Sequence, residues 1–309
     1  MSLSNLLLSE SVVIASINQG GIQTVKPETI QKYRMAIKSL VNVIGDIDCA
    51  LVTAPMVLEW QRTTTFILSP VSSNNYLNIY RGIFNRLTKR GIVQTNPFTY
   101  VPLLDTPSLD PKNVKKEHFE ILVKRSPIKF KAILWLLWDT GARPSEICDI
   151  KKEKIEITED AMGLQFAAPV IGKFNKERWI FARHEAAKAV LNYIDIRTPS
   201  DSPYLFLGRT TKPMKRPAIY QGIVSIKTKK CPEIPADVKI TPQMFRPTWA
   251  YRMWVEGKSI AWISKALGHV DLAFTVNRYF RPTKQQMKDA YFNETSPRMG
   301  VEFNTNAHW

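Results

Sequence analysis

The chain has 309 residues, a length that predicts about two domains, each large enough to bury a core. Its 43 lysine and arginine residues outnumber 27 aspartate and glutamate residues, and the resulting formal charge of +16 favours a polyanionic partner. There is no run of about 18 apolar residues and no basic, signal-like start, so we expect a cytoplasmic, nucleoid-associated protein that binds no membrane. The three cysteines and four histidines lack metal-ligand spacing, so neither a metal nor another cofactor is expected.

Amphipathic helices are predicted in the first third of the chain. One runs from Pro27 to a stop at Gly45, with apolar residues at helical spacing, and others cover residues 54–66 and 72–90. The outer face of the last helix carries four basic side chains, which are either candidate phosphate contacts or an ordinary solvated face. They are Arg81, Arg86, Lys89 and Arg90.

A stretch rich in proline and aspartate, residues 96–111, predicts a linker between two different patterns. Up to residue 107 the chain has 9 basic and 6 acidic residues, against 34 and 21 beyond it, so the basic excess lies mainly in the second part. The predicted organisation is an N-terminal extension, a helical domain, a second domain and a C-terminal tail. Their ranges are 1–25, 26–105, 106–292 and 293–309.

The second domain mixes helices with a small sheet. Residues 154–181 contain short runs that alternate like strands joined by turns, which predicts a small antiparallel sheet. Helices are predicted before and after it, so the fold class is mainly α with this sheet. The helical ranges are 115–124, 128–140, 184–196, 242–256, 260–267, 273–279 and 282–292.

Two stretches of the second domain place basic residues at turns. In LLWDTGARPSEICDI a helix ends at Thr-Gly and delivers Arg143 just before a new helix, where it could approach a phosphate or pair with Glu146. In VIGKFNKERWIFA two strands flank a turn that carries Lys173 and Lys176. A hairpin lysine could reach into a groove of a nucleic acid, as proposed for Lys176, or donate a proton to a leaving oxygen, although surface hairpins are also lysine-rich for solubility.

Two later stretches add polar groups that suit phosphate chemistry. TPQMFRPTWAYRMW puts Gln243 and Arg246 three residues apart, on one face near a helix N-terminus, where anions are favoured. ISKALGHVDLAFTVNRYF closes a helix at Leu-Gly, and His269 and Tyr279 follow. Each stretch is weak alone, because most single tyrosines and arginines are packing or surface residues.

In chain order the four stretches read TGxRxSE, GKxNKER, TPxxxRxTxA and LGH with a following tyrosine. This combination resembles the tyrosine recombinase (phage integrase) family over residues 112–292. The resemblance implies an α+β catalytic domain, and the first domain is similar to the family's helical core-binding domain in size, helicity and position. Carried over residue by residue, the two phosphate-binding arginines are Arg143 and Arg246, and the nucleophile is Tyr279.

The resemblance also assigns proton-transfer roles. Lys173 matches the hairpin lysine acid, with Lys176 as the alternative, and His269 matches the last histidine or tryptophan. Most members have a histidine where Gln243 stands, and often one where Pro247 follows the second arginine. Gln243 can donate a hydrogen bond but cannot shuttle a proton at neutral pH. Proton transfer is therefore the step where this chain departs from the family pattern.

The implied function is site-specific recombination in a Xer-like, two-domain layout. Double-stranded DNA would be cleaved and rejoined through a 3′-phosphotyrosine, without metal or ATP, in the integration or excision of a mobile element. The resemblance further implies a homotetramer on two DNA sites, a tail at residues 293–309 that docks onto a neighbour, and an accessory DNA-bending or directionality factor as a further candidate partner. Two alternatives stay open, a type IB topoisomerase and a catalytically weak DNA-binding accessory factor.

Overall fold

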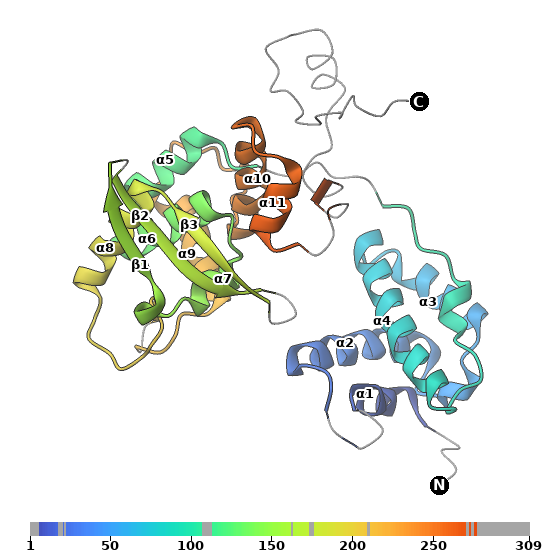
Figure 1. Ribbon diagram of the computed structural model, residues 1–309. Coiled ribbons are helices and arrows are strands. Elements are labelled where there is room, and N and C mark those ends of the chain that lie inside the picture. Colours follow the sequence, from blue (N-terminus) through green and yellow to red (C-terminus); the bar gives the residue numbers. More distant parts are fainter. Residues whose placement is uncertain are drawn as a thin grey trace, which may run out of the picture. The chain divides into compact units, whose positions relative to one another are not determined.

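A computed structural model describes residues 6–17, 21, 23–106, 113–161, 163–172, 176–208, 211–269, 272, 275 and 276. The chain forms two compact units, Met1–Leu109 and Asp110–Trp309, which are described separately (Figure 1). Within the described ranges, no helix combines the length and apolar character needed to cross a bilayer. The predicted nucleophile Tyr279, the hairpin lysine Lys173, the predicted helix at 282–292 and the predicted tail all lie outside the described residues.

The first unit is helical. Three of its helices carry proline in the first turn, where the ring fixes φ and no helical hydrogen bond is lost. The second helix ends as predicted at Gly45, whose φ of 84° is in the region that glycine tolerates. The elements are α1 (Leu8–Ser16), α2 (Pro27–Ile44), η1 (Cys49–Leu51), α3 (Ala54–Thr64), α4 (Pro70–Lys89) and η2 (Pro97–Tyr100).

The core of this unit contains residues from two segments that were predicted to be an N-terminal extension and a linker. Leu8 and Val12 of α1 are buried in the same core as Tyr80 of α4, so the boundary predicted at residue 26 falls inside the unit. Phe98 of η2 is also fully buried there, although residues 96–111 were expected to be a linker. The short apolar helix α1 and the aromatic ring of η2 complete a core that the three longer helices leave open.

The second unit mixes helices with a small antiparallel sheet, which confirms the predicted fold class. The sheet has the order β1-β2-β3, and Ala168 of the central strand pairs with Ile180. The strands are β1 (Glu156–Asp160), β2 (Gly163–Ile171) and β3 (Glu177–Ala182). The helices are α5 (Lys116–Arg125), α6 (Ile128–Thr140), α7 (Pro144–Asp149), η3 (Lys152–Lys154), α8 (His184–Ile196), α9 (Arg216–Lys230), η5 (Pro242–Met244), α10 (Phe245–Val255) and α11 (Ile260–Leu267).

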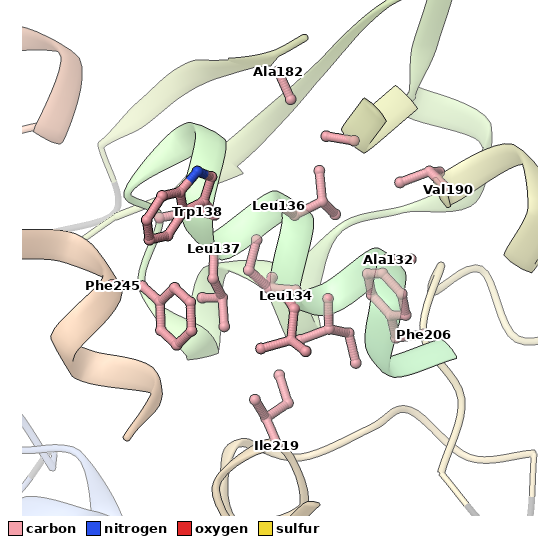
Figure 2. Close-up of a cluster of buried hydrophobic side chains, with 14 of the residues drawn as sticks. Ala132, Leu134, Leu136, Leu137, Trp138, Ala182, Val190, Phe206, Ile219 and Phe245 are labelled. Atoms are coloured by element: carbon pink, nitrogen blue, oxygen red, sulfur yellow. The ribbon is translucent and has the colours of Figure 1, made fainter. Parts of the chain in front are cut away.

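Helix α6 forms the centre of the second core. It is apolar almost all round, as expected of a helix buried on every side. Figure 2 shows Leu134, Leu137 and Trp138 of this helix among side chains from α10, from α8 and from the segment around Phe206. Full burial of each such side chain contributes about 1.5–3 kcal/mol. The end of α6, and therefore the turn that carries Arg143, is anchored to the centre of this core.

Helix α9 was not predicted from the sequence. Its Gly222 lowers helix propensity, and its buried apolar residues Ile219, Ile223 and Ile226 form only a short stripe. The structure gives the glycine a packing role, because a Cβ there would lie 2.0 Å from the ring of Phe130 in α6. Gly222, which lowers the helix propensity of this segment, therefore allows α9 to pack closely against α6.

Candidate active site

The turn after α6 presents Arg143. Gly141 ends the helix in the left-handed conformation, with φ 58°, and the Thr140 hydroxyl accepts a hydrogen bond from the Ala142 amide at 3.1 Å. Arg143 then occupies the N-cap of α7, and Pro144 begins that helix. The Thr-Gly-Ala-Arg-Pro order therefore encodes a sharp helix-to-helix turn with Arg143 at its apex.

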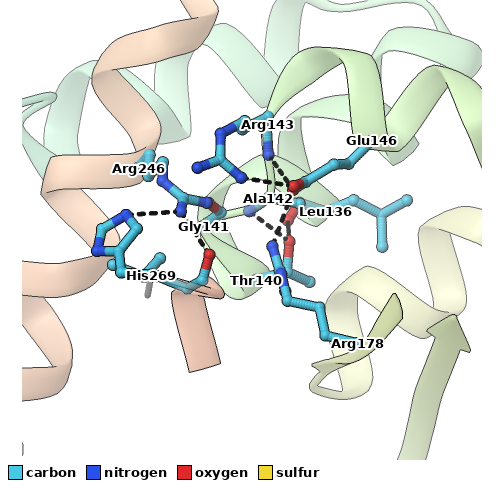
Figure 3. Close-up of polar contacts among 10 residues, drawn as sticks. Leu136, Thr140, Gly141, Ala142, Arg143, Glu146, Arg178, Arg246 and His269 are labelled. Atoms are coloured by element: carbon cyan, nitrogen blue, oxygen red, sulfur yellow. Dashed lines mark hydrogen bonds and ion pairs between the residues drawn. The ribbon is translucent and has the colours of Figure 1, made fainter. Parts of the chain in front are cut away.

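Helix α10 packs against this turn and brings Arg246 to it. The indole N–H of Trp249 donates to the Asp139 carbonyl at 2.6 Å, and its ring lies so close that a Cβ at Gly141 would be 2.9 Å away. Arg246 donates from Nη1 to the Gly141 carbonyl at 2.9 Å and from Nη2 to the Leu267 carbonyl at 2.5 Å. Its side chain is only 7% exposed, so these bonds hold the guanidinium beside the turn (Figure 3).

A buried carboxylate holds two more arginines. Glu146 of α7 is 2% exposed and accepts from the Arg143 backbone amide and from Arg143 Nη1, both at 2.7 Å. Its other contact is Arg178 of β3, whose Nη2 donates to Oε2 at 2.8 Å (Figure 3). The ion pair that was weighed against a phosphate role for Arg143 is therefore formed. It uses one Nη of a side chain that is still 34% exposed, so the two roles are compatible.

Arg178 is the least satisfied of the three arginines. Its side chain is 12% exposed, and its Nε and Nη1 are buried without a hydrogen-bond partner among the described residues. Burial lowers the pKa of its guanidinium, although an arginine stays charged at neutral pH. The same side chain packs against Gly268, where a Cβ would lie 2.9 Å from Arg178 Cδ. Arg178 therefore lies between Glu146 and the turn that carries His269.

His269 contacts Arg246 at this site. Its Nε2 lies 2.9 Å from Arg246 Nη2, and its Nδ1 lies 2.6 Å from the Thr275 hydroxyl oxygen. Burial and then the positive charges of Arg246, Arg143 and Arg178 lower the pKa of His269 to about 4. The imidazole is consequently neutral at pH 7 and acts as a hydrogen-bonding group rather than as a cation.

The remaining predicted residues of the second unit are at the surface where they are described. Gln243 is exposed in η5, one turn before Arg246, and Pro247 lies in the first turn of α10, where it removes no helical hydrogen bond. Lys176 is exposed at the base of the β2–β3 hairpin, and its carbonyl accepts from the Gly172 amide at 2.8 Å. In the part of the chain that the structure describes, no three His, Cys, Asp or Glu side chains gather as a metal site would require.

In the first unit, three of the four candidate DNA contacts bind the protein's own backbone. Arg81 donates to the Phe98 and Val101 carbonyls at 3.0 and 2.7 Å. Arg86 and Arg90 donate to the carbonyls of Ala15 and Ile17. These bonds attach α4 to the two ends of the unit, and both Arg86 and Lys89 are exposed. A DNA contact by any of the four stays a prediction.

Sequence reasoning did not assign roles to Arg178, Ser264 or Thr275. Arg178 ends the KER of the hairpin motif, and the two hydroxyl residues flank the LGH motif. Thr275 is fully buried, and its hydroxyl contacts both His269 and, at 2.9 Å, the Ser264 hydroxyl. The sequence feature that could have identified these three residues is their position close to the motifs.

The chain is similar in sequence to known tyrosine recombinases. The tyrosine recombinase XerA of Pyrococcus furiosus is 31% identical over 189 residues, which cover 60% of this chain and 62% of that protein. The chain therefore matches less than two thirds of that relative's length. A tyrosine recombinase XerC of Bacillus pumilus is 26% identical over 228 residues, covering 69% of this chain and 71% of that protein.

Solved structures share the fold. The Tn1549 transposon integrase in complex with a circular intermediate DNA matches 92% of this chain and 98% of its own, with a TM-score of 0.70 and 18% identity. A lambda integrase tetramer bound to a Holliday junction matches 91% of this chain and 80% of its own, with a TM-score of 0.69 and 13% identity. The model of the phage integrase family matches residues 109–286. This chain belongs to the phage integrase family.

Proposed function

We propose that this protein is a site-specific DNA recombinase that cleaves and rejoins strands through a 3′-phosphotyrosine. The observation that carries the proposal is the convergence of Arg143 and Arg246 on one turn, with the neutral ring of His269 against Arg246. The arginines Arg143, Arg178 and Arg246 share the site with one carboxylate, Glu146, so the formal excess is three minus one, or two positive charges. Such a site suits an anion.

The arginines address the main difficulty of the reaction. A phosphodiester is negatively charged, and nucleophilic attack places more charge on its non-bridging oxygens. A guanidinium offers a planar set of donors and does not deprotonate, so two of them can stabilise the charge that grows in the transition state. Arg246 is buried and fixed by two carbonyls, whereas Arg143 is partly exposed and able to turn toward DNA.

The covalent step follows from the resemblance. The Tyr279 hydroxyl loses its proton to solvent as its oxygen attacks phosphorus, and the bond from phosphorus to the 5′-oxygen breaks. Lys173 donates a proton to that 5′-oxygen and regains one from solvent, with Lys176 as the alternative donor. The 5′-hydroxyl of a partner strand reverses the step, so religation consumes no ATP. Gln243, exposed one turn before Arg246, supplies at most a neutral hydrogen bond. The reaction is therefore expected to be slow at the proton-transfer step.

The partners are also proposed by similarity. The Tn1549 integrase was solved on a circular intermediate DNA and lambda integrase as a tetramer on a Holliday junction, which supports double-stranded DNA as substrate and a homotetramer on two sites. Integration or excision of a mobile element, assisted by an accessory DNA-bending or directionality factor, is the proposed biological role. A formal charge of +16 supports binding through phosphates, with strong salt dependence.

The decisive experiment is covalent trapping. Nicked suicide duplexes that tile the DNA flanking the gene are incubated with the protein, and SDS-stable adducts are mapped by mass spectrometry. We expect an adduct on Tyr279 that is absent in Tyr279→Phe, while Tyr251→Phe serves as a matched control. Absence of an adduct on every duplex would overturn the enzymatic proposal and favour a DNA-binding accessory factor.

Two further measurements refine the proposal. Relaxation of supercoiled DNA without exchange between paired sites would indicate a type IB topoisomerase instead of a recombinase. Gln243→His tests the departure from the family pattern. A faster cleavage rate would show that glutamine attenuates proton transfer, and an unchanged rate would show that this site works without a histidine.

A further inference from the structure

Behind His269 lies a short line of buried hydroxyl groups. Ser264 belongs to the last turn of α11, Gly268 ends that helix with φ 69°, and His269 follows. Thr275 Oγ1 lies 2.6 Å from His269 Nδ1 and 2.9 Å from Ser264 Oγ. The side chains of Thr275 and Ser264 are 0% and 5% exposed, so water does not compete for these bonds.

The contacts define one tautomer of His269 in the protein without DNA. A guanidinium has only donors, so Arg246 Nη2, at 2.9 Å, donates to His269 Nε2, which must then be unprotonated. The neutral ring carries its single proton on Nδ1 and donates it to Thr275, and Thr275 donates in turn to Ser264. The pKa of about 4 agrees with a neutral ring.

A bound phosphate requires the opposite arrangement. Non-bridging oxygens only accept hydrogen bonds, so a phosphate beside Arg246 needs a proton on His269 Nε2 instead of on Nδ1. Charging the ring would supply one, but three nearby arginines oppose that charge. Moving the proton to the other nitrogen keeps the ring neutral, provided that the groups behind Nδ1 can switch from accepting to donating. Hydroxyls can do so by rotation.

We propose that Ser264 and Thr275 form a reversible hydroxyl relay that lets neutral His269 change tautomer when the scissile phosphate binds. The Nδ1 proton passes to Thr275, the Thr275 proton passes to Ser264 and the Ser264 proton passes to solvent, while Nε2 gains a proton from solvent, so the charge of the ring is unchanged. Ser264 then donates to Thr275, Thr275 donates to Nδ1, and Nε2 donates to the phosphate. Thr275 and Ser264 are thus positioning residues. The phosphate half of this inference rests on the proposed function, whereas the tautomer of the free protein does not.

The two states can be read directly by NMR. The full chain is labelled with ¹⁵N-histidine, long-range ¹H–¹⁵N correlations are recorded at pH 7, and the His269 signals are assigned by their loss in His269→Asn. The probe is orthovanadate, a tetrahedral oxyanion. We expect the Nδ1–H tautomer in the free protein and the Nε2–H tautomer at saturating vanadate. An Nε2–H ring in the free protein, or an Nδ1–H ring with vanadate bound, overturns the relay.

Variants separate hydrogen bonding from shape. Thr275→Val keeps the shape but removes the hydroxyl, so the free ring should become a mixture of tautomers and cleavage should fall by about tenfold, the value of one lost hydrogen bond. Thr275→Ser should restore both readouts, and Ser264→Ala should show a smaller change of the same kind. Wild-type tautomers and cleavage in both Thr275→Val and Ser264→Ala would contradict the proposal.

The outcomes also distinguish this inference from the proposed function. If the free-state tautomer is as expected but vanadate does not perturb His269, the tautomer switch is overturned together with the phosphate clamp, and only the static hydrogen bonds remain. If Tyr279 forms its adduct while Thr275→Val leaves the tautomer unchanged, the recombinase proposal stands and the relay fails.

Discussion

The two units use arginine in different ways. In the helical unit, Arg81, Arg86 and Arg90 extend from α4 to backbone carbonyls near the ends of the same unit. In the second unit, Arg143 and Arg178 converge on Glu146. Burial, and then the positive charges of Arg246, Arg143 and Arg178, lower the pKa of His269. A row of arginines on a helix face therefore indicates little about DNA, because each can satisfy a carbonyl. Convergence of several on one turn is the informative pattern.

The largest expected effect is the loss of Arg143. Arg143→Ala should lower cleavage of a suicide substrate by about 10²–10³-fold, because one donor to the developing charge is removed. Its side chain is 34% exposed, and Glu146 keeps its contact with Arg178, so the melting temperature should change little. Arg86→Ala in the helical unit is the matched control and should cleave within about twofold of wild type. Equal losses in both variants would remove the distinction between the units.

A smaller loss is expected for Arg178, which pairs with Glu146 and packs against Gly268. Arg178→Met removes a guanidinium with two buried donors that lack a partner in the described part of the chain, and such replacements are often neutral or stabilising. Glu146 would then bind Arg143 alone, so cleavage should fall by about tenfold while the melting temperature holds. Arg178→Lys should recover part of the rate if the contact with Glu146 matters. A strongly destabilised Arg178→Met protein would show instead that the pair is a folding element.

Substitutions of the helical unit's arginines should lower its stability more than its affinity for DNA, the opposite of what is expected for Arg143 and Arg178. Arg86→Ala removes a bond to the Ala15 carbonyl that attaches α4 to the end of α1, at a cost of about 1.5 kcal/mol. The salt dependence of DNA affinity should not change, whereas the exposed Lys89, if it contacts a phosphate, should reduce that slope by about one when replaced by alanine. A reduced slope in Arg86→Ala would assign this arginine to DNA as well.

The smallest effect concerns pH. The pKa of His269 is about 4 in the folded protein against an ordinary 6.5, so between these values the unfolded chain takes up a proton that the folded protein refuses. Stability should therefore fall as the pH drops from about 7 toward 4. In His269→Asn this contribution is gone, and the melting temperature should fall less between pH 7 and pH 5. Parallel curves for the two proteins would mean that His269 titrates normally when folded.

Sequence patterns predicted most helices because glycine residues mark several of their ends. Thr140–Gly141 and Leu267–Gly268 end two helices where predicted, and Gly45 ends a third. Helix α9 was missed because Gly222 is retained for a contact with Phe130, a residue far away in the sequence. Helix α1 was predicted to belong to an N-terminal extension, because its burial depends on packing against longer helices that lie further along the chain.

In the candidate site, too, some residues could be predicted from local motifs and others could not. Arg143, Arg246 and His269 lie in short motifs, so the resemblance could place them. The contact between Arg178 and Glu146 joins positions 32 residues apart, and the one between Thr275 and Ser264 joins positions 11 apart. Such pairs depend on how α11, α7 and β3 come together, which no local pattern encodes.

The contact between Gly141 and the Trp249 ring has a practical consequence for protein engineering. The indole occupies the space where a side chain at position 141 would be, and Arg246 bonds to the Gly141 carbonyl from the same helix. The distance between Arg143 and Arg246 therefore depends on the Trp249 ring and on the lack of a side chain at Gly141. A chimeric recombinase that exchanges α10 without the α6–α7 turn would inherit both arginines but misalign them, so the two segments must be exchanged as one cassette.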